Sequence, residues 1–415
     1  MTTVEIITIG DELLIGQVID TNSPWMSRKL NAAGFDVRYK TTVGDDESDL
    51  LDAFEKALAR AQVVLVTGGI GPTKDDITKK TLCKFFNTSL VFDEKTLETI
   101  KTVIRGFGRE LNELTLSQAY VPQNCTVIQN RMGTAPVTWF DKEGKILVSM
   151  PGVPYEMKGV MDEEILLRLR TFFHPDDTIL HRTFWIKNYS ESLLAIRLET
   201  FESELPPEIK LAYLPNFGWI RLRLTGKGTD FDDLSRLMDN QHEKLVACLG
   251  KDIVSEIDEN LENILDKQLK EKNLTLTLAE SCTGGKLASM ITAIPGCSSY
   301  FKGGIVCYSN EIKQQLLDVD SSLLTNYGAV SQQVVEAMAT GARRTFSADC
   351  VIAVSGTAGP DGGTPEKPVG TVWIAVSCQG RIQSQKYHFS QNRESNILRA
   401  CNNGIRMLLE WIHEE

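Results

Sequence analysis

The sequence predicts a multi-domain α/β protein. Strand-like apolar runs alternate with helix-like segments over roughly the first 175 residues and again after residue 250, which is typical of parallel sheets covered by helices. Some runs, such as Val63 to Val66, are apolar at every position, as expected of strands buried on both faces. A chain of 415 residues is also long enough for two to four folded units.

The composition and the charge disfavour several classes of protein. No apolar run reaches the roughly 18–20 residues of a membrane span, and the N-terminus does not resemble a secretory signal, so we expect a cytoplasmic protein without a membrane partner. The nine Cys lack metal-ligand spacing and indicate reduced, buried thiols. A formal net charge of -11 disfavours a broad nucleic-acid surface, so no nucleic-acid partner is expected.

Residues 1–174 are predicted to form the first domain. Its first long helix should have Asn22 or Ser23 as its cap, Pro24 in its first turn and Gly34 just past its end. Strands are predicted at 4–9, 35–43, 63–66 and 146–148, and further helices at 48–60, at 75–86 and up to residue 173.

A small α+β domain is predicted for residues 175–252 and a third domain, again α/β, for residues 253–415. The boundary is placed at His174-Pro175-Asp176-Asp177, and residues 220–224 alternate apolar and basic side chains like a half-buried strand. The basic stripe favours a solvated sheet face over nucleic-acid contact. In the third domain, strands are predicted at 274–278, 304–308, 350–354 and 369–376, and helices at 257–272, 284–293, 312–317 and 331–346 and at the C-terminus.

The third domain carries the clearest chemical motif, Ala279-Glu280-Ser281-Cys282-Thr283-Gly284-Gly285. It lies where a buried strand is predicted to turn into a helix, a place that presents a hydroxyl at the sheet edge beside the free N–H groups of the helix start. Ser281 is therefore a candidate nucleophile with its own anion donors. The alternative is that these small residues only cap the helix.

Two further segments follow neighbouring predicted strands. Tyr308-Ser309-Asn310-Glu311-Ile312-Lys313 and the glycine-rich stretch that begins at Ser355 should reach the same crevice as Ser281. Since no His accompanies Ser281, Lys313 is the better candidate base, which requires a pKa lowered by about 3 units from ~10.4. Tyr308 would orient the lysine or relay its proton, and Cys282 is the rival nucleophile.

These motifs resemble the C-terminal domain of the CinA family (competence/damage-inducible protein A). The resemblance rests on AESCTGG, YSNEIK, SGTAGPDGG and KPVGTV, and it implies deamidation of nicotinamide mononucleotide with no cofactor. It further implies Ser281 as the nucleophile, with Lys313 and Tyr308 completing the site. The substrate-binding residues expected in this domain are Thr283, Gly284, Gly285, Ser355, Gly356, Thr357, Gly359, Gly362 and Gly363.

The first domain has polar motifs at two strand ends. Asp11 and Glu12 follow the first strand, and the string Thr67-Gly68-Gly69-Ile70-Gly71-Pro72-Thr73-Lys74-Asp75-Asp76 follows the third. Glycines before a helix bind phosphate, and carboxylates recruit a divalent metal to it. For Asp11 and Glu12 alone, a helix N-terminal charge pair is the open alternative. The segments NRMGTAP and MPGVPYE add two small-residue loops.

These strings resemble the molybdopterin-binding fold in its CinA-type branch, which implies a three-layer α/β/α domain that hydrolyses ADP-ribose to AMP and ribose 5-phosphate. The resemblance implies a divalent metal, Mg²⁺ or Co²⁺, with K⁺ as a further cation, and a KH-like middle domain. No G-x-x-G occurs near Gly226 to Gly228, so RNA binding is not expected. The expected metal ligands are Asp11, Glu12, Asp75 and Asp76, and the expected phosphate or substrate contacts are Gly68, Gly69, Thr73, Gly133 and Thr134.

The resulting hypothesis is a homodimeric hydrolase with two activities in the recycling of pyridine nucleotides. The dimer is implied by the resemblance alone. Two other hypotheses stay open: a non-catalytic scaffold in DNA uptake or damage response, and a pterin-binding protein.

Overall fold

The computed structural model describes residues 2–73, 76–108, 110–174, 178–187, 189–216, 219–256 and 258–414. It confirms a multi-domain α/β chain. Two compact units are present, Met1–Leu180 with Gly226–Asp239, and His181–Thr225 with Asn240–Glu415. The boundaries proposed at 174 and 252 stay predictions. Across the described ranges, no helix combines the length and the apolar character needed to cross a membrane.

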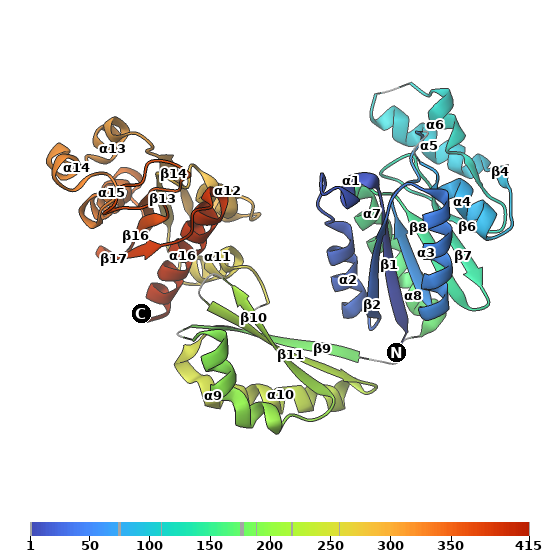
Figure 1. Cartoon of the computed structure of the whole chain (residues 1–415), viewed down its shortest axis with the longest axis horizontal. Coiled ribbons are helices and arrows are strands. Elements are labelled where there is room, and N and C mark those ends of the chain that lie inside the picture. Colours follow the sequence, from blue (N-terminus) through green and yellow to red (C-terminus); the bar gives the residue numbers. More distant parts are fainter. Residues whose placement is uncertain are drawn as a thin grey trace. The chain divides into compact units, whose positions relative to one another are not determined.

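The N-terminal unit is built on a six-stranded sheet in the order β2-β1-β3-β8-β7-β6 (Figure 1). The first four strands of that order are parallel, whereas β7 and β6 run antiparallel to their neighbours. The strands are β1 (Thr3–Ile9), β2 (Asp36–Val43), β3 (Val63–Thr67), β6 (Thr126–Ile128), β7 (Val137–Lys142) and β8 (Lys145–Met150), and a separate pair is formed by β4 (Leu90–Phe92) and β5 (Tyr120–Pro122).

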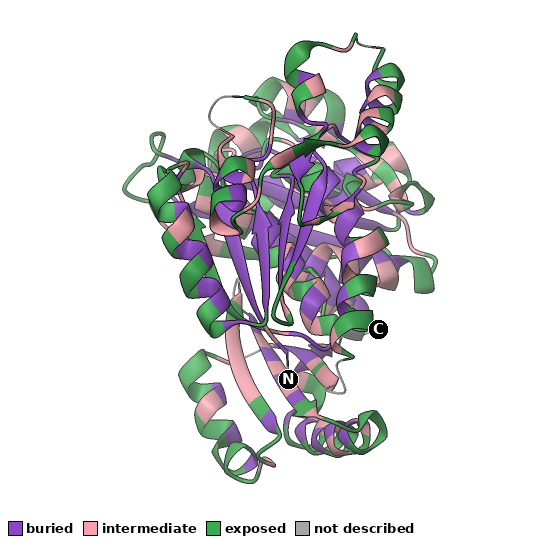
Figure 2. Cartoon of the chain, turned by 90° about the vertical axis from the view of Figure 1, so that its right-hand side faces the viewer, coloured by how far each residue is buried: buried purple, intermediate pink, exposed green. Residues whose placement is uncertain are grey.

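Helices cover both faces of this sheet because its central strands are apolar on both sides. Met26 and Met157 belong to the core on one face, and Leu50 and Leu82 to the core on the other. Figure 2 shows the central strands as buried. The helices are α1 (Asp11–Leu14), α2 (Asn22–Ala32), α3 (Glu47–Arg60), α4 (Thr78–Phe85), α5 (Glu94–Gly106), α6 (Glu113–Ser117), α7 (Pro154–Val160), a π-helical turn (Met161–Ile165) and α8 (Leu166–Phe173).

The register of the sheet brings the two predicted motifs of this unit to one edge. Thr8 of β1 lies opposite Thr67 of β3, and both strands end within one residue of this pair. The segments that follow, Gly10 to Glu12 and Gly68 to Gly71, therefore leave the sheet side by side.

The central part of the chain forms a four-stranded sheet, β10-β11-β9-β12, with two long helices. Leu222 and Leu224 of β11 are buried while Arg221 and Arg223 are half-buried, which confirms the predicted alternation. Arg221 pairs with Asp258 and lies over the ring of Trp185, so this basic residue has structural partners. The elements are β9 (Thr178–Ile186), α9 (Glu191–Ser203), β10 (Ile209–Asn216), β11 (Trp219–Gly228), α10 (Phe231–Leu249) and β12 (Ile253–Ser255).

The C-terminal sheet has the order β14-β13-β15-β16-β17, with the first three strands parallel and the last two antiparallel (Figure 1). Glu280 of β13 lies opposite both Val306 and Val354, so the ends of three parallel strands share one edge. The strands are β13 (Leu276–Glu280), β14 (Phe301–Val306), β15 (Cys350–Gly356), β16 (Thr371–Cys378) and β17 (Arg381–His388), and the helices are α11 (Leu261–Glu271), α12 (Lys286–Thr292), α13 (Asn310–Leu317), α14 (Ser321–Tyr327), α15 (Gln332–Phe346) and α16 (Arg393–Glu414).

Three strand predictions in this sheet were displaced, since the strand predicted at 369–376 is β16, Thr371–Cys378. The predicted strand 274–278 is β13, which starts and ends two residues later because the buried polar Glu280 belongs to it. The predicted strand 304–308 is β14, which starts and ends earlier. The polar edge strand β17 had no apolar signal and was not predicted.

Candidate functional site

Ser281 is the first residue after β13 and is held at the strand ends. Its main-chain N–H donates to the carbonyl of Val354 at 3.0 Å, which continues the β13–β15 ladder by one bond. The side chain is 8% exposed, and its Oγ lies 3.2 Å from Nζ of Lys313. The contact expected between these two residues is therefore present.

Lys313 lies on α13, whose start is capped by the hydroxyl of Ser309. Its side chain is only 1% exposed, and its Nζ also reaches the carbonyl oxygens of Cys307 at 2.7 Å and Tyr308 at 3.1 Å. Burial lowers the pKa of Lys313, as its proposed role as a base requires. A neutral amine has two N–H groups for these two carbonyls, which leaves its lone pair to accept the hydrogen of Ser281.

Tyr308 supports this lysine through its main chain. Its side chain is 60% exposed, and its hydroxyl accepts a hydrogen bond of 3.4 Å from Arg393, whose other terminal nitrogen donates to the carbonyl of Gly359 at 2.7 Å. In the described part of the chain the Tyr308 hydroxyl makes no hydrogen bond to Lys313. The geometry therefore does not support the predicted relay of a proton through the Tyr308 side chain.

Glu280 changes the predicted anion site at the start of α12. Its buried carboxylate accepts hydrogen bonds from the main-chain N–H groups of Gly285 at 3.0 Å, Leu287 at 3.1 Å and Ala288 at 2.8 Å. These N–H groups are the donors that were predicted to bind an anion. The expectation that the helix start is free was wrong, because the residue before Ser281 already occupies it.

Thr283 retains unused hydrogen-bonding groups in this turn. Neither its hydroxyl nor its main-chain N–H has a partner in the described part of the chain, although the residue is 3% exposed. The N–H of Gly284, by contrast, donates to the carbonyl of Ser281. Cys282 points into the hydrophobic core, and burial raises the pKa of its thiol to about 12, so it does not fit the role of rival nucleophile.

A cavity of about 690 Å³ opens beside this turn. It is bordered by two cationic side chains, Lys286 and Arg393, by the carboxylate of Glu394, and by the apolar side chains of Ile397 and Leu398. The lining residues are Thr283, Gly284, Gly285, Lys286, Ser289, Arg393, Glu394, Ile397 and Leu398. Such a surface suits an anionic ligand that also carries an apolar ring.

The glycine-rich segment after β15 is shaped by its own packing. The Ser355 hydroxyl donates to the carbonyl of Ala329 at 2.7 Å, and the main-chain N–H of Thr357 donates to Thr371. A side chain at Gly356, Gly359 or Gly363 would press on Val372 or Val369, and Gly362 has a positive φ of 87°. None of these predicted substrate contacts lines the cavity, and of them only Gly359 touches Arg393.

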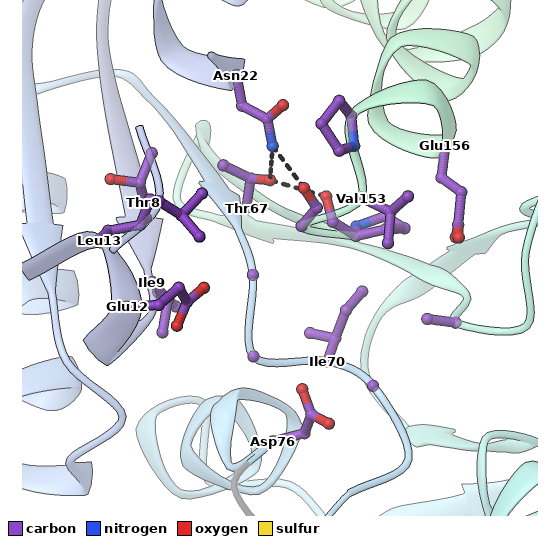
Figure 3. Close-up of a pocket in the computed structure, with 18 of the residues that line it drawn as sticks. Thr8, Ile9, Glu12, Leu13, Asn22, Thr67, Ile70, Asp76, Val153 and Glu156 are labelled. Atoms are coloured by element: carbon purple, nitrogen blue, oxygen red, sulfur yellow. Dashed lines mark hydrogen bonds between the residues drawn. The ribbon is translucent and has the colours of Figure 1, made fainter. Parts of the chain in front are cut away.

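The N-terminal unit has a second cavity, of about 430 Å³, at the edge where β1 and β3 end (Figure 3). Gly68, Gly69, Thr134, Glu12 and Asp76 line it, as the motifs predicted. The N–H groups of the turn from Gly69 to Gly71 have no acceptor among the described residues. Successive free amides of this kind form a site for phosphate.

The other predicted residues of this site lie differently. The Asp11 carboxylate accepts the N–H of Asp45 at 3.2 Å, and the N–H and hydroxyl of Thr73 both donate to Asp76. Asp11, Thr73 and Gly133 do not line the cavity. Asp75 lies outside the described residues.

The predicted divalent metal ion would need oxygen ligands from the carboxylates near the N-terminal cavity. Within the described ranges no three His, Cys, Asp or Glu side chains gather closely enough to hold a metal ion. Glu12 and Asp76 nevertheless both border the cavity that contains the free amides. This set fits a Mg²⁺ ion that is bound by one or two carboxylates and by a substrate phosphate, rather than an all-protein cage.

Several residues of these sites were not predicted from the sequence. Glu280 could have been found, because a carboxylate in an otherwise apolar strand must be paired when it is buried. Glu156, 9% exposed, belongs to a motif that received no assigned role. Arg393 was given no role from the sequence. Asn22 was predicted only as the cap of the first long helix, but the cap of α2 is Thr21, and the tertiary fold brings Asn22 to the cavity instead.

Comparison with known proteins gives consistent similarities over the chain. Residues 258–412 match the "CinA C-terminal domain" family model and residues 5–171 match the "Probable molybdopterin binding domain" model. A CinA-like protein of Flavobacterium psychrophilum is 43% identical over 98% of both chains, and one of Cytophaga hutchinsonii is 42% identical over 95% of this chain and 94% of that protein. The crystal structure of the competence/damage inducible protein CihA from Agrobacterium tumefaciens, 35% identical, covers 36% of this chain and 91% of that chain with a TM-score of 0.35.

Proposed function

The chain belongs to the CinA family, and on that premise we propose that its C-terminal unit is an amidohydrolase that converts nicotinamide mononucleotide to nicotinate mononucleotide and ammonia. One observation carries the proposal: the buried Nζ of Lys313 lies 3.2 Å from Oγ of Ser281. A serine becomes a nucleophile when an adjacent neutral amine can take its proton.

In the proposed first step, Ser281 Oγ attacks the carboxamide carbon while its proton passes to Lys313 Nζ. We assign the donors for the developing oxyanion to Thr283, two residues after Ser281, since its N–H and hydroxyl are unused. The lysine then gives the proton to the leaving nitrogen, the C–N bond breaks, and ammonia departs. The product of this half-reaction is an ester on Ser281.

In the second step, the same lysine takes a proton from water, which attacks the ester carbon. The C–O bond to Ser281 breaks, the serine regains its proton from the lysine, and the acid product releases its own proton to solvent and leaves as the carboxylate. Lys313 ends each half-reaction as a neutral amine, so no cofactor is needed for the proton balance.

The cavity beside the turn from Thr283 to Gly285 is lined by neither Ser281 nor Lys313, but its cationic border supports a phosphate-bearing substrate. Arg393 and Lys286 are exposed cations at its border, and Ile397 and Leu398 offer an apolar surface to a ring. Arg393 is fixed by the carbonyl of Gly359 and the hydroxyl of Tyr308. We assign Arg393 the role of holding the phosphate, because guanidinium groups bind phosphate with two parallel hydrogen bonds.

The test is release of ammonia from nicotinamide mononucleotide by the full chain and by Ser281→Ala. We expect the variant to be inactive, with Ser298→Ala, an exposed serine of the same unit, unaffected. Ammonia release by Ser281→Ala at the wild-type rate would overturn the assigned nucleophile. A wild-type chain that releases no ammonia would overturn the proposal and favour the scaffold hypothesis.

We propose a second activity, metal-dependent hydrolysis of ADP-ribose to AMP and ribose 5-phosphate, for the N-terminal cavity. The supporting observation is that the free amides of Gly69 to Gly71 share this cavity with the carboxylates of Glu12 and Asp76. A divalent ion bound there would neutralise phosphate charge. Phosphate release after phosphatase treatment of the products would measure the reaction, and Asp76→Asn should lose it.

A further inference from the structure

The N-terminal cavity contains a pair of buried acceptors that the proposed function does not use. Asn22 is 8% exposed and Glu156 is 9% exposed, and both line the cavity. Figure 3 draws both side chains on the side of the Thr67–Ile70 turn that faces away from Asp76. They come from the starts of α2 and α7, on the same face of the sheet.

The orientation of the Asn22 amide is fixed by its partners. Its Nδ2 donates to Oγ1 of Thr67 at 3.2 Å and to the carbonyl of Gly152 at 2.8 Å. The Thr67 hydroxyl donates its hydrogen to the carbonyl of Pro151, so it can only accept a hydrogen bond from Asn22. The reverse orientation would place Oδ1 against two acceptors. Oδ1 therefore lies on the side of the amide away from Thr67 and Gly152, where it is buried and has no partner in the described part of the chain.

Glu156 is held in place by the motif NRMGTAP. Its Oε2 accepts from Nδ2 of Asn130 at 2.7 Å, and Asn130 is itself fixed because its Nδ2 also donates to Ala135 and its Oδ1 accepts from the N–H of Met132. A Cβ at Gly133 would overlap the Glu156 carboxylate. Position 133 therefore requires a glycine, because the Glu156 carboxylate occupies the space that a side chain at position 133 would need.

From these two acceptors we infer that this side of the cavity binds the part of a ligand that carries hydrogen-bond donors, either ribose hydroxyls or the amino group of a heterocycle. The inference rests on the proposed N-terminal function and deepens it. Phosphate oxygens are acceptors, so they are excluded here and are directed to the free amides of Gly69 to Gly71. The cavity would therefore fix the direction in which a nucleotide lies.

Buried acceptors discriminate strongly between ligands because an unpaired buried oxygen costs its full desolvation energy. Glu156 and Asn22 would therefore act as specificity-determining residues. Burial also raises the pKa of Glu156, which a ligand donating hydrogen bonds to the ionised carboxylate would offset.

The experiment measures binding of three probes to the full chain by calorimetry: ADP-ribose, inorganic diphosphate and a pterin. The variants are Glu156→Gln, Gly133→Ala, which displaces the carboxylate, and Glu163→Gln, the same chemical change at an exposed position outside the cavity. Thermal unfolding of each variant shows whether it is folded. We expect Glu156→Gln to weaken ADP-ribose by about tenfold and diphosphate by less than twofold, and Glu163→Gln to change neither.

The binding data distinguish failure of the inferred ligand specificity from failure of the proposed ADP-ribose hydrolysis. Equal losses for ADP-ribose and diphosphate, or no loss of ADP-ribose affinity in Glu156→Gln, would overturn the inference while leaving the proposed function intact. If the wild type binds the pterin and not ADP-ribose, and Glu156→Gln loses the pterin, the inference holds and ADP-ribose hydrolysis fails. Binding of neither organic probe would overturn both.

Discussion

The carbonyl oxygen of Cys307 lies 2.7 Å from Nζ of Lys313, closer than the hydroxyl of Ser281 at 3.2 Å. With the Tyr308 carbonyl, it holds the amine from the loop between β14 and α13. The position of the lysine thus depends on its own loop rather than on the serine. Substitution of Ser281 should leave Lys313 in place, so the nucleophile and the base can be tested by independent substitutions.

Lys313→Met should reduce ammonia release by about 10²–10⁴-fold, the usual contribution of a positioned base. Methionine fills a similar volume without a charge, so the variant should remain folded. Ammonia release and thermal unfolding, measured beside Lys302→Met at an exposed position, check this. Full activity in Lys313→Met would rule out the lysine as the base.

The activity of the C-terminal unit should depend on pH through Lys313. Because burial lowers its pKa, kcat/KM should fall as the pH drops through this lowered value and the amine becomes protonated. An activity that stays constant down to pH 5 would contradict a lysine base.

The same shift predicts a dependence of stability on pH. Between the lowered pKa and the ordinary value of 10.5, the unfolded chain binds a proton at Lys313 that the folded chain does not, so this residue makes the free energy of unfolding rise with pH. Lys313→Met removes this contribution. The difference in unfolding free energy between Lys313→Met and the wild type, measured with denaturant, should favour the variant most strongly below the lowered pKa of Lys313. This pH-dependent difference should vanish near pH 10.5. A constant difference would refute the shift.

Glu280→Ala should cost about 2–4 kcal/mol of unfolding free energy, because it leaves three buried or half-buried N–H groups at the start of α12 without their acceptor. Ammonia release should fall as well, since the turn that carries Ser281 and Thr283 is no longer held. Glu271→Ala at the exposed end of α11 is the matched control and should change stability by less than about 0.5 kcal/mol.

Two helical glycines should respond to alanine with opposite signs. In α15, a Cβ at Gly341 would overlap the carbonyl of Leu317, so Gly341→Ala should destabilise by about 1–3 kcal/mol. Gly106 of α5 has nothing within contact of a Cβ, so Gly106→Ala should stabilise by up to about 1 kcal/mol. Denaturant unfolding of both variants checks the close approach of α13 and α15. Equal changes in unfolding free energy for the two variants would contradict it.

Removal of divalent metal should separate the two proposed activities. A chelator should abolish ADP-ribose hydrolysis and leave ammonia release unchanged, because the Ser281–Lys313 pair needs no metal for its proton transfers. Both reactions are assayed on one preparation before and after chelation, with added Mg²⁺ as the restoring control. Loss of ammonia release on chelation would contradict the assigned mechanism.

Local patterns were enough to predict the α/β class, about half of the strands in the described part of the chain, and the place of Ser281 and Lys313. Apolar runs such as 63–66 form strands because burial on both faces demands them, and the ends of parallel strands must share an edge. The predicted homodimer and the proposed metal stay predictions.

What the tertiary structure alone decided is the partner of each polar group. Glu280 occupies the amides reserved for a ligand, Asp11 turns to Asp45, and Asn22 and Glu156 meet at one cavity although 134 positions separate them in the sequence. Hydrophobic burial is nearly independent of direction, so a short pattern specifies it, whereas a hydrogen bond depends on distance and angle to an atom that folding brings from elsewhere.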